Sequence, residues 1–187
     1  MHSLLDAWFS HNAWPAPSQY VSADISLDDA KQLAERVQHM AITLDLQGLK
    51  NHPALQRIAS EASLYTQVSG QWQILRPDLV AYTTHAANET NATHTPNTTH
   101  TPNAAWVLDF KLSFNPAYVN PDVSTRDASL ATAESYAAQL RSYQNALMLK
   151  GLASDAYILT LDGQCWALGQ GLAAQTTQWQ QVSPPWV

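Results

Sequence analysis

The 187-residue sequence lacks several features that would place a protein in a common class. It contains one cysteine, Cys165, which excludes an internal disulfide framework and a cysteine-rich zinc site. It has no run of about 18 apolar residues that could span a membrane. It also has no Gly-x-x-x-x-Gly-Lys motif, so no nucleotide-driven motor is expected in this chain.

An excess of positive charge is missing as well. Nine Lys and Arg residues stand against fifteen Asp and Glu residues, and the formal net charge is −6. This balance argues against holding nucleic acid through bulk positive charge, but it does not exclude an enzyme that contacts phosphates through metal ions. The first residues contain no basic segment followed by an apolar core, so no signal peptide is expected. We therefore expect a cytoplasmic protein.

The length and the apolar content predict one folded domain over residues 1–187. Residues 1–25 contain several aromatic side chains and two prolines, which indicates an irregular arm or a short helix laid over the core. Residues 83–104 are rich in Thr, Asn, His and Pro and have almost no large apolar side chains. This composition is typical of an insertion at a hairpin tip, and we expect no catalytic residue there.

Periodic patterns predict the main helices and strands. A capping-box start at Ser26 and an apolar stripe predict a helix over 26–44. Pro53 suits the first turn of a short helix that ends near residue 60, and an Ala-rich helix is expected over 132–150, followed by Gly151 as its cap. Strands are expected at 64–68, at 71–82 with a bend at Pro77, and at 105–113, 156–161 and 164–168.

The strand 105–113 is the most informative stretch, because two charged residues interrupt its apolar run. Side chains alternate across a strand, so Asp109 and Lys111 share one face while Leu108 and Phe110 share the other. Burying such charges is costly unless they have partners. These residues alone leave two interpretations open: a structural salt bridge, or half of a metal-dependent phosphodiesterase site.

Other residues with suitable chemistry lie on the flanking elements. Glu61 stands just before the predicted hairpin, and the bend that precedes Asp78 would aim its carboxylate away from the regular pleat. Gln139 and Tyr143 are four residues apart on one helix face, which also fits ordinary surface and core positions. His39 falls about 140° from the centre of the apolar stripe of its helix, as a solvated surface histidine would.

Taken in order, these residues resemble the PD-(D/E)xK nuclease superfamily, and more narrowly the RecB/AddA-type nuclease domain at the C-terminus of helicase–nucleases. The resemblance covers roughly residues 30–170. The matching residues are His39, Glu61, Pro77-Asp78, Asp109-Phe110-Lys111, and Gln139 with Tyr143. The sequence departs from the family in two places. Arg76-Pro77 stands where a glycine is common, and the insertion lengthens the spacing between the two aspartates.

The resemblance implies an α/β fold with a restriction-endonuclease-like core, in which a small mixed sheet is flanked by helices. It implies hydrolysis of DNA, single- or double-stranded, with Mg²⁺ or Mn²⁺ as the cofactor. Asp78, Asp109, the backbone carbonyl of Phe110 and the imidazole of His39 would hold the metal. An imidazole among oxygen ligands would favour Mn²⁺ somewhat.

The resemblance also implies roles for the remaining residues. Lys111 would act on the attacking water or contact the phosphate. Glu61 would hold a second metal through water or orient Lys111. Gln139 and Tyr143 would border the site and contact the nucleic-acid backbone.

The expected function is that of an exonuclease domain of a helicase–nuclease in DNA repair and recombination. The helicase motor would then lie in a larger polypeptide or in a partner protein. Three alternatives remain: a non-catalytic nuclease-like module that binds DNA ends or a protein, a stand-alone endonuclease, and an unrelated fold in which Asp109 and Lys111 form a surface pair.

Overall fold

The computed structural model describes residues 1–68, 70–84, 103–114, 123–169 and 179–187, with the backbone alone at 68 and 123–132. Its helices are α1 (His2–His11), the short 3-10 helix η1 (Pro17–Tyr20), α2 (Leu27–Thr43), α3 (Leu46–Asn51) and α4 (Val123–Met148). Its strands are β1 (Leu55–Ser60), β2 (Leu64–Val68), β3 (Gln71–Leu75), β4 (Leu79–Thr83), β5 (Ala104–Lys111), β6 (Ala153–Thr160), β7 (Cys165–Leu168) and β8 (Trp179–Gln181).

A six-stranded mixed sheet forms the centre of the molecule, with the strand order β1-β4-β5-β6-β7-β8. Strands β5 and β6 are parallel, and α4 connects them in sequence. The other neighbours in this sheet are antiparallel. Strands β2 and β3 form a separate two-stranded sheet. The predicted α/β class and the mixed sheet flanked by helices are confirmed.

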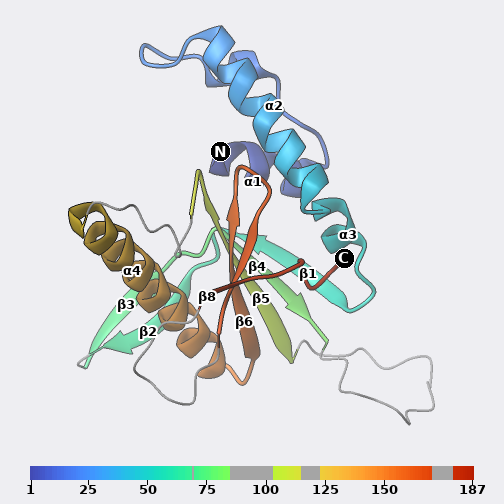
Figure 1. The fold of residues 1–187 in the computed structure, drawn as a ribbon. Helices are drawn as coiled ribbons and strands as arrows, with labels where there is room; N and C mark the ends of the chain where they lie inside the picture. Colours follow the sequence, from blue (N-terminus) through green and yellow to red (C-terminus); the bar gives the residue numbers. More distant parts are fainter. Residues whose placement is uncertain (69, 85–102, 115–122, 170–178) are drawn as a thin grey trace.

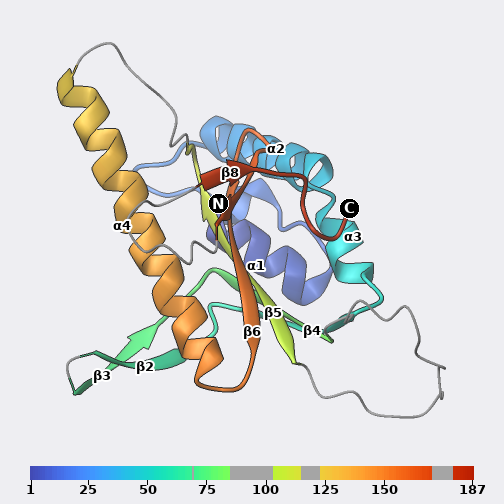
Figure 2. The same ribbon diagram turned by 60° about the horizontal axis from the view of Figure 1, so that its bottom comes forward.

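Helices cover both faces of the large sheet (Figures 1 and 2). Helices α1, α2 and α3 pack on one face, where Leu108 and Phe110 of β5 are buried. Helix α4 packs on the other face, where Val107 of β5 and Ile158 of β6 are buried. The period of two in β5 therefore sends alternate side chains into two separate cores, as the sequence predicted.

Local sequence signals place two of the helices well. At the start of α2, the Ser26 hydroxyl accepts a hydrogen bond from the backbone N–H of Asp29 at 3.1 Å, and the capping box is complete. At the end of α4, Leu152 N–H donates to Leu147 O at 3.1 Å, and Gly151 has a φ of 76°, as a glycine cap requires. Helix α4 nevertheless begins at Val123, nine residues before the predicted start.

The prediction of a helix between Pro53 and residue 60 is wrong, because residues 55–60 form the edge strand β1. This strand pairs antiparallel with β4, and its register shifts between Leu55 and Arg57. Pairing with β4 outweighs the local preference of a Pro-initiated turn for helix. The short helix of this region, α3, ends earlier, and His52 is its C-cap residue.

The hairpin β2–β3 forms with the predicted register, in which Val68 pairs with Gln71. After it the chain bends at Pro77, as expected, but the continuation enters the other sheet as β4. The insertion predicted at 83–104 falls between the antiparallel neighbours β4 and β5, and its residues 85–102 lie outside the described residues.

Both ends of the chain pack against the core. Within the predicted N-terminal arm, α1 buries Leu4, Leu5 and Trp8. Near the C-terminus, Trp186 is buried and its indole N–H donates to Leu44 O at 2.9 Å. No helix in the described part of the chain has the length and the apolar character needed to cross a membrane.

Candidate active site

Two aspartates face each other where β4 and β5 pair. Leu79 is the register partner of Leu108, so antiparallel pairing brings the next residues, Asp78 and Asp109, opposite each other. The backbone N–H of Phe110 donates to Asp78 Oδ2 at 2.7 Å, which fixes the Asp78 carboxylate against the end of β5. Asp109 is 2 % exposed. The sheet thus brings together two acidic residues that are 31 positions apart in the sequence.

The environment of Asp78 raises the pKa of its carboxyl group to about 6. Burial is the largest cause, and the negative charge of Asp109 raises the pKa further. The hydrogen bond from Phe110 N–H and the nearby His2 act in the opposite direction. Two ionised carboxylates held this closely repel each other unless a cation lies near them.

Lys111 supplies one positive charge at this site. Its Nζ lies 2.8 Å from Asp109 Oδ2 and 4.7 Å from the centre of the Tyr136 ring on α4. The ammonium is close enough for an ion pair, but Asp109 Oδ2 has no hydrogen-bond partner within the described residues. Lys111 balances the charge of this buried carboxylate, and the oxygen keeps lone pairs that a metal ion could share with the ammonium.

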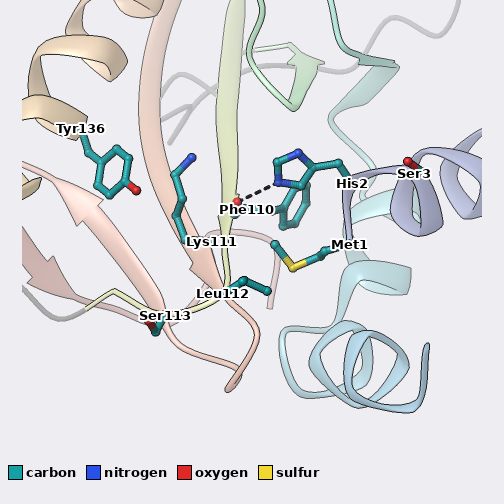
Figure 3. A pocket seen from close by; sticks show the side chains of 8 residues that line it. All are labelled: Met1, His2, Ser3, Phe110, Lys111, Leu112, Ser113 and Tyr136. Atoms are coloured by element: carbon teal, nitrogen blue, oxygen red, sulfur yellow. Dashed lines mark hydrogen bonds between the residues drawn. The ribbon is translucent and has the colours of Figure 1, made fainter. Parts of the chain in front are cut away.

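The imidazole that lies at the carboxylates belongs to His2 on α1. His2 Nε2 is 3.0 Å from the carbonyl oxygen of Phe110, and His2 Nδ1 is 3.5 Å from Asp78 Oδ1 (Figure 3). A carbonyl can only accept, so Nε2 carries the proton in this contact. In the neutral ring, Nδ1 therefore presents its lone pair on the side of Asp78.

His39, the histidine assigned from the resemblance, is not brought to this group. It is exposed on α2, and its described contacts are with Thr43 of the same helix: its carbonyl accepts from Thr43 Oγ1 at 2.9 Å, and its Nδ1 lies 3.4 Å from that hydroxyl. His39 therefore lies on the helix surface, as its angle from the apolar stripe of the helix predicts. Sequence reasoning missed His2, because residues 1–25 are predicted only to cover the core, as an irregular arm or a short helix.

Glu61 lies on the other flank of Asp78. Its backbone N–H donates to Asp78 O at 3.0 Å, and its φ of 46° is unusual for a residue with a side chain. Together with His2 and Asp78, it lines a small cavity between α1 and the sheet. The structure therefore places Glu61 beside the carboxylates and just before the hairpin β2–β3, as predicted, although the unpredicted strand β1 precedes it.

Gln139 and Tyr143 support the segment that leads to Asp78. The side-chain amide of Gln139 donates to the Tyr143 hydroxyl, which donates in turn to Arg76 O at 3.3 Å. Tyr143 is 3 % exposed, and burial raises the pKa of its phenol. Gln139 is exposed and available to a ligand, whereas Tyr143 acts by holding the backbone just before Asp78.

An open cleft of about 640 Å³ adjoins this group. It lies between the start of α1, the end of β5 and α4, and Figure 3 shows its lining side chains. These are Met1, His2, Ser3, Phe110, Lys111, Leu112, Ser113 and Tyr136. Lys111 and Tyr136 face it from one side and His2 from the other, so a phosphate in the cleft would meet both basic side chains.

The donor set suits Mg²⁺ or Mn²⁺: two carboxylates, one backbone carbonyl and one imidazole. Asp109 Oδ2, which is ion-paired with Lys111 but accepts no hydrogen bond from a described residue, fits the same interpretation. Among the described residues, however, no group of three or more His, Cys, Asp or Glu side chains is already arranged to hold a metal ion. Metal binding therefore stays a prediction that rests on the types and placement of these groups.

No protein-family model matches the sequence, and no curated protein or solved structure matches it significantly.

Proposed function

We propose that this protein is a metal-dependent deoxyribonuclease with a restriction-endonuclease-like core. The observation that carries the proposal is the pairing of Asp78 with the buried Asp109 beside Lys111, which lines the open cleft. At the same point Lys111 Nζ lies 2.8 Å from Asp109 Oδ2, an oxygen that accepts no hydrogen bond from a described residue. This combination is costly for a purely structural site, and it matches the needs of phosphodiester hydrolysis.

Each group has a chemical task in this proposal. Asp78, Asp109, the Phe110 carbonyl and His2 would hold the ion. A bound Mg²⁺ or Mn²⁺ supplies Lewis acidity and lowers the pKa of a coordinated water. Lys111 neutralises charge on the phosphate or beside the attacking water.

Two further roles follow from the positions of the flanking residues. Glu61 is expected either to hold a second metal through water or to orient Lys111. Because it lies beside Asp78, we retain the first of these roles. Gln139 is the exposed member of its pair, so it is the one that we expect to contact the DNA backbone.

We further propose that the enzyme is an exonuclease that works with a helicase motor, in the manner of a RecB/AddA-type nuclease. The net charge of −6 supports this part, because a partner that delivers the strand removes the need for a strongly basic surface.

The test is cleavage of labelled linear and circular DNA, each as single and double strands. We expect degradation of linear DNA with Mg²⁺ or Mn²⁺, none with EDTA, and recovery when the metal is restored. Cleavage of closed circles at the same rate would contradict the exonuclease assignment. Absence of metal-dependent cleavage on all four substrates would contradict the nuclease assignment.

One observation favours a second candidate, a non-catalytic module for DNA ends or a protein partner. The 2.8 Å contact between Lys111 and Asp109 is what a structural ion pair would show. In that case Asp109→Asn would destabilise the fold by roughly 3–5 kcal/mol, the usual cost of breaking a buried pair. The same variant would leave the affinity for DNA unchanged.

A further inference from the structure

The hairpin β2–β3 has one buried face and one solvent-exposed face. On the inner face, Leu64 and Thr66 are buried, and Leu64 packs in the core beneath α4. The side chains of Tyr65, Trp72 and Ile74 point the other way and are 50 %, 72 % and 58 % exposed. Figures 1 and 2 show this hairpin beside α4 at the edge of the molecule. We call the surface formed by these three side chains the outer face.

The outer face is organised by strand pairing. Tyr65 is the register partner of Ile74, and Gln67 is the partner of Trp72, so all four side chains project from the same side of the ribbon. Two of the four are aromatic, and none is charged. Trp72 in this exposed position contributes little to the core, because it is largely left in water.

The charge of this segment differs from that of the rest of the chain. The sequence has fifteen acidic residues, but none lies between Glu61 and Asp78, and the single charged residue there is Arg76, which is exposed. A polyanion can therefore approach the hairpin without meeting a carboxylate of the segment, and Arg76 lies between Trp72 and Asp78 in the sequence.

A short stretch of chain connects the hairpin to the candidate active site. Strand β3 runs into Arg76, and Asp78 follows two residues later. Tyr143 holds the carbonyl of Arg76, so this connection is fixed on α4. Asp78 is six positions after Trp72, a path of at most about 20 Å in an extended chain. A bound strand several nucleotides long could contact both places.

We propose that the outer face is a stacking platform for the bases of single-stranded DNA on its way to the carboxylate pair. Aromatic rings stack on unpaired bases of any sequence, whereas the bases of a duplex already stack on one another. The hairpin therefore gives preference for single strands without base-specific contacts. This inference rests on the proposed nuclease function for the use of the platform, but base stacking itself needs no catalysis.

The test measures binding by the full chain in EDTA, where hydrolysis is not required. Fluorescence anisotropy at low salt would compare a labelled thymidine oligonucleotide with a duplex of the same length. We expect the wild-type protein to prefer the single strand. Trp72→Ala should weaken single-strand binding by about tenfold and remove most of that preference, while Trp72→Phe should retain it.

Ile42→Ala is the matched control, since Ile42 is 79 % exposed on α2, away from the hairpin. This control should bind like the wild type. Wild-type protein that does not bind the oligonucleotide, or equal affinities for wild type and Trp72→Ala, would overturn the inference. A changed oligomeric state of Trp72→Ala with unchanged DNA affinity would instead identify a second copy of the chain as the occupant.

The two proposals can fail separately. Loss of affinity in Trp72→Ala without any metal-dependent cleavage by the wild type would support the platform and refute the nuclease. Metal-dependent cleavage by the wild type, together with unaltered DNA affinity in Trp72→Ala, would support the nuclease and refute the platform.

Discussion

Asp78 is held in surroundings that oppose its own ionisation. Its pKa is raised to about 6, mainly by burial and then by Asp109, even though the Phe110 N–H and His2 act against this rise. A divalent cation beside both carboxylates would reverse the effect, because it favours their ionised forms. Without a cation, ionised Asp78 lowers the stability of the folded protein.

The first prediction concerns the pH dependence of stability. The pKa of Asp78 is higher in the folded protein, at about 6, than its ordinary value of 3.8. The folded state then binds more protons between these values, so the contribution of Asp78 to the free energy of unfolding falls as the pH rises from about 4 to about 6. At about 1.4 kcal/mol per pKa unit, the loss at neutral pH is roughly 3 kcal/mol.

Asp78→Asn removes this titration, so in EDTA it should be more stable than the wild type at pH 7 and equal to it near pH 3.5. Urea unfolding at both pH values measures the difference. Asp24→Asn, at an exposed position, is the control and should change stability at neither pH. A destabilised Asp78→Asn at pH 7 would show that the ionised carboxylate is a favourable part of the metal-free fold.

A pair of histidine variants tests the second prediction. His2→Ala should weaken Mn²⁺ binding by about tenfold, because it removes the imidazole beside Asp78 and Phe110. His39→Ala should leave the affinity unchanged, since His39 is exposed on α2. Isothermal titration calorimetry compares the two. The reverse order of effects would restore His39 as the ligand.

Lys111 carries the third prediction. Lys111→Met keeps the aliphatic length of the side chain but removes the charge, and it should lower the cleavage rate by about 100-fold or more. The matched variant Lys31→Met, on the exposed side of α2, should cleave at the wild-type rate. Circular dichroism checks that both variants fold. Near-normal cleavage by folded Lys111→Met would assign the lysine a structural role only.

At the scale of elements, local signals could be predicted and long-range pairing could not. The cap at Ser26, the turn of the β2–β3 hairpin and the glycine after α4 are each encoded within a few residues. Strand β1 has no comparable local signal, and its conformation depends on β4, more than twenty residues later. For residues 1–25, the spacing of Leu4, Leu5 and Trp8 is the signal that favours a short helix over an irregular arm.

The fourth prediction concerns the support that α4 gives to Asp78. Tyr143→Phe removes the hydrogen bond from the Tyr143 hydroxyl to Arg76 O. It also removes the acceptor of the hydrogen bond that the Gln139 amide donates. The free energy of unfolding should fall by about 1 kcal/mol, and cleavage should slow because the backbone before Asp78 is less firmly held. Thermal unfolding and a cleavage assay measure the two effects.

Tyr20→Phe is the matched control, because the hydroxyl of Tyr20 makes an exposed contact 3.4 Å from Ser3 O. It should alter neither stability nor cleavage. If Tyr143→Phe were as stable and as active as this control, the Gln139–Tyr143 pair would have no supporting role.

At the scale of the whole molecule, the candidate site is assembled from three distant parts of the chain. Asp109 could be predicted because it and Lys111 form a conspicuous charged pair in an apolar strand, and Asp78 because it follows the bend at Pro77. The resemblance names both aspartates. His2 could not be found in the same way. It is 76 positions before Asp78 in the sequence, and only the packing of α1 on the sheet brings the two side chains together. The α/β class followed from the alternation of helical and strand patterns, whereas the restriction-endonuclease-like core stays a prediction.

The central claim is that Asp109 takes part in metal-dependent hydrolysis of DNA. The most direct test is the cleavage rate of an end-labelled single-stranded oligonucleotide with Mn²⁺, for the wild type, Asp109→Asn and the control Asp24→Asn. We predict that Asp109→Asn loses at least about 1,000-fold in rate while it stays folded, and that the control cleaves normally. Cleavage by folded Asp109→Asn at the wild-type rate would contradict the claim.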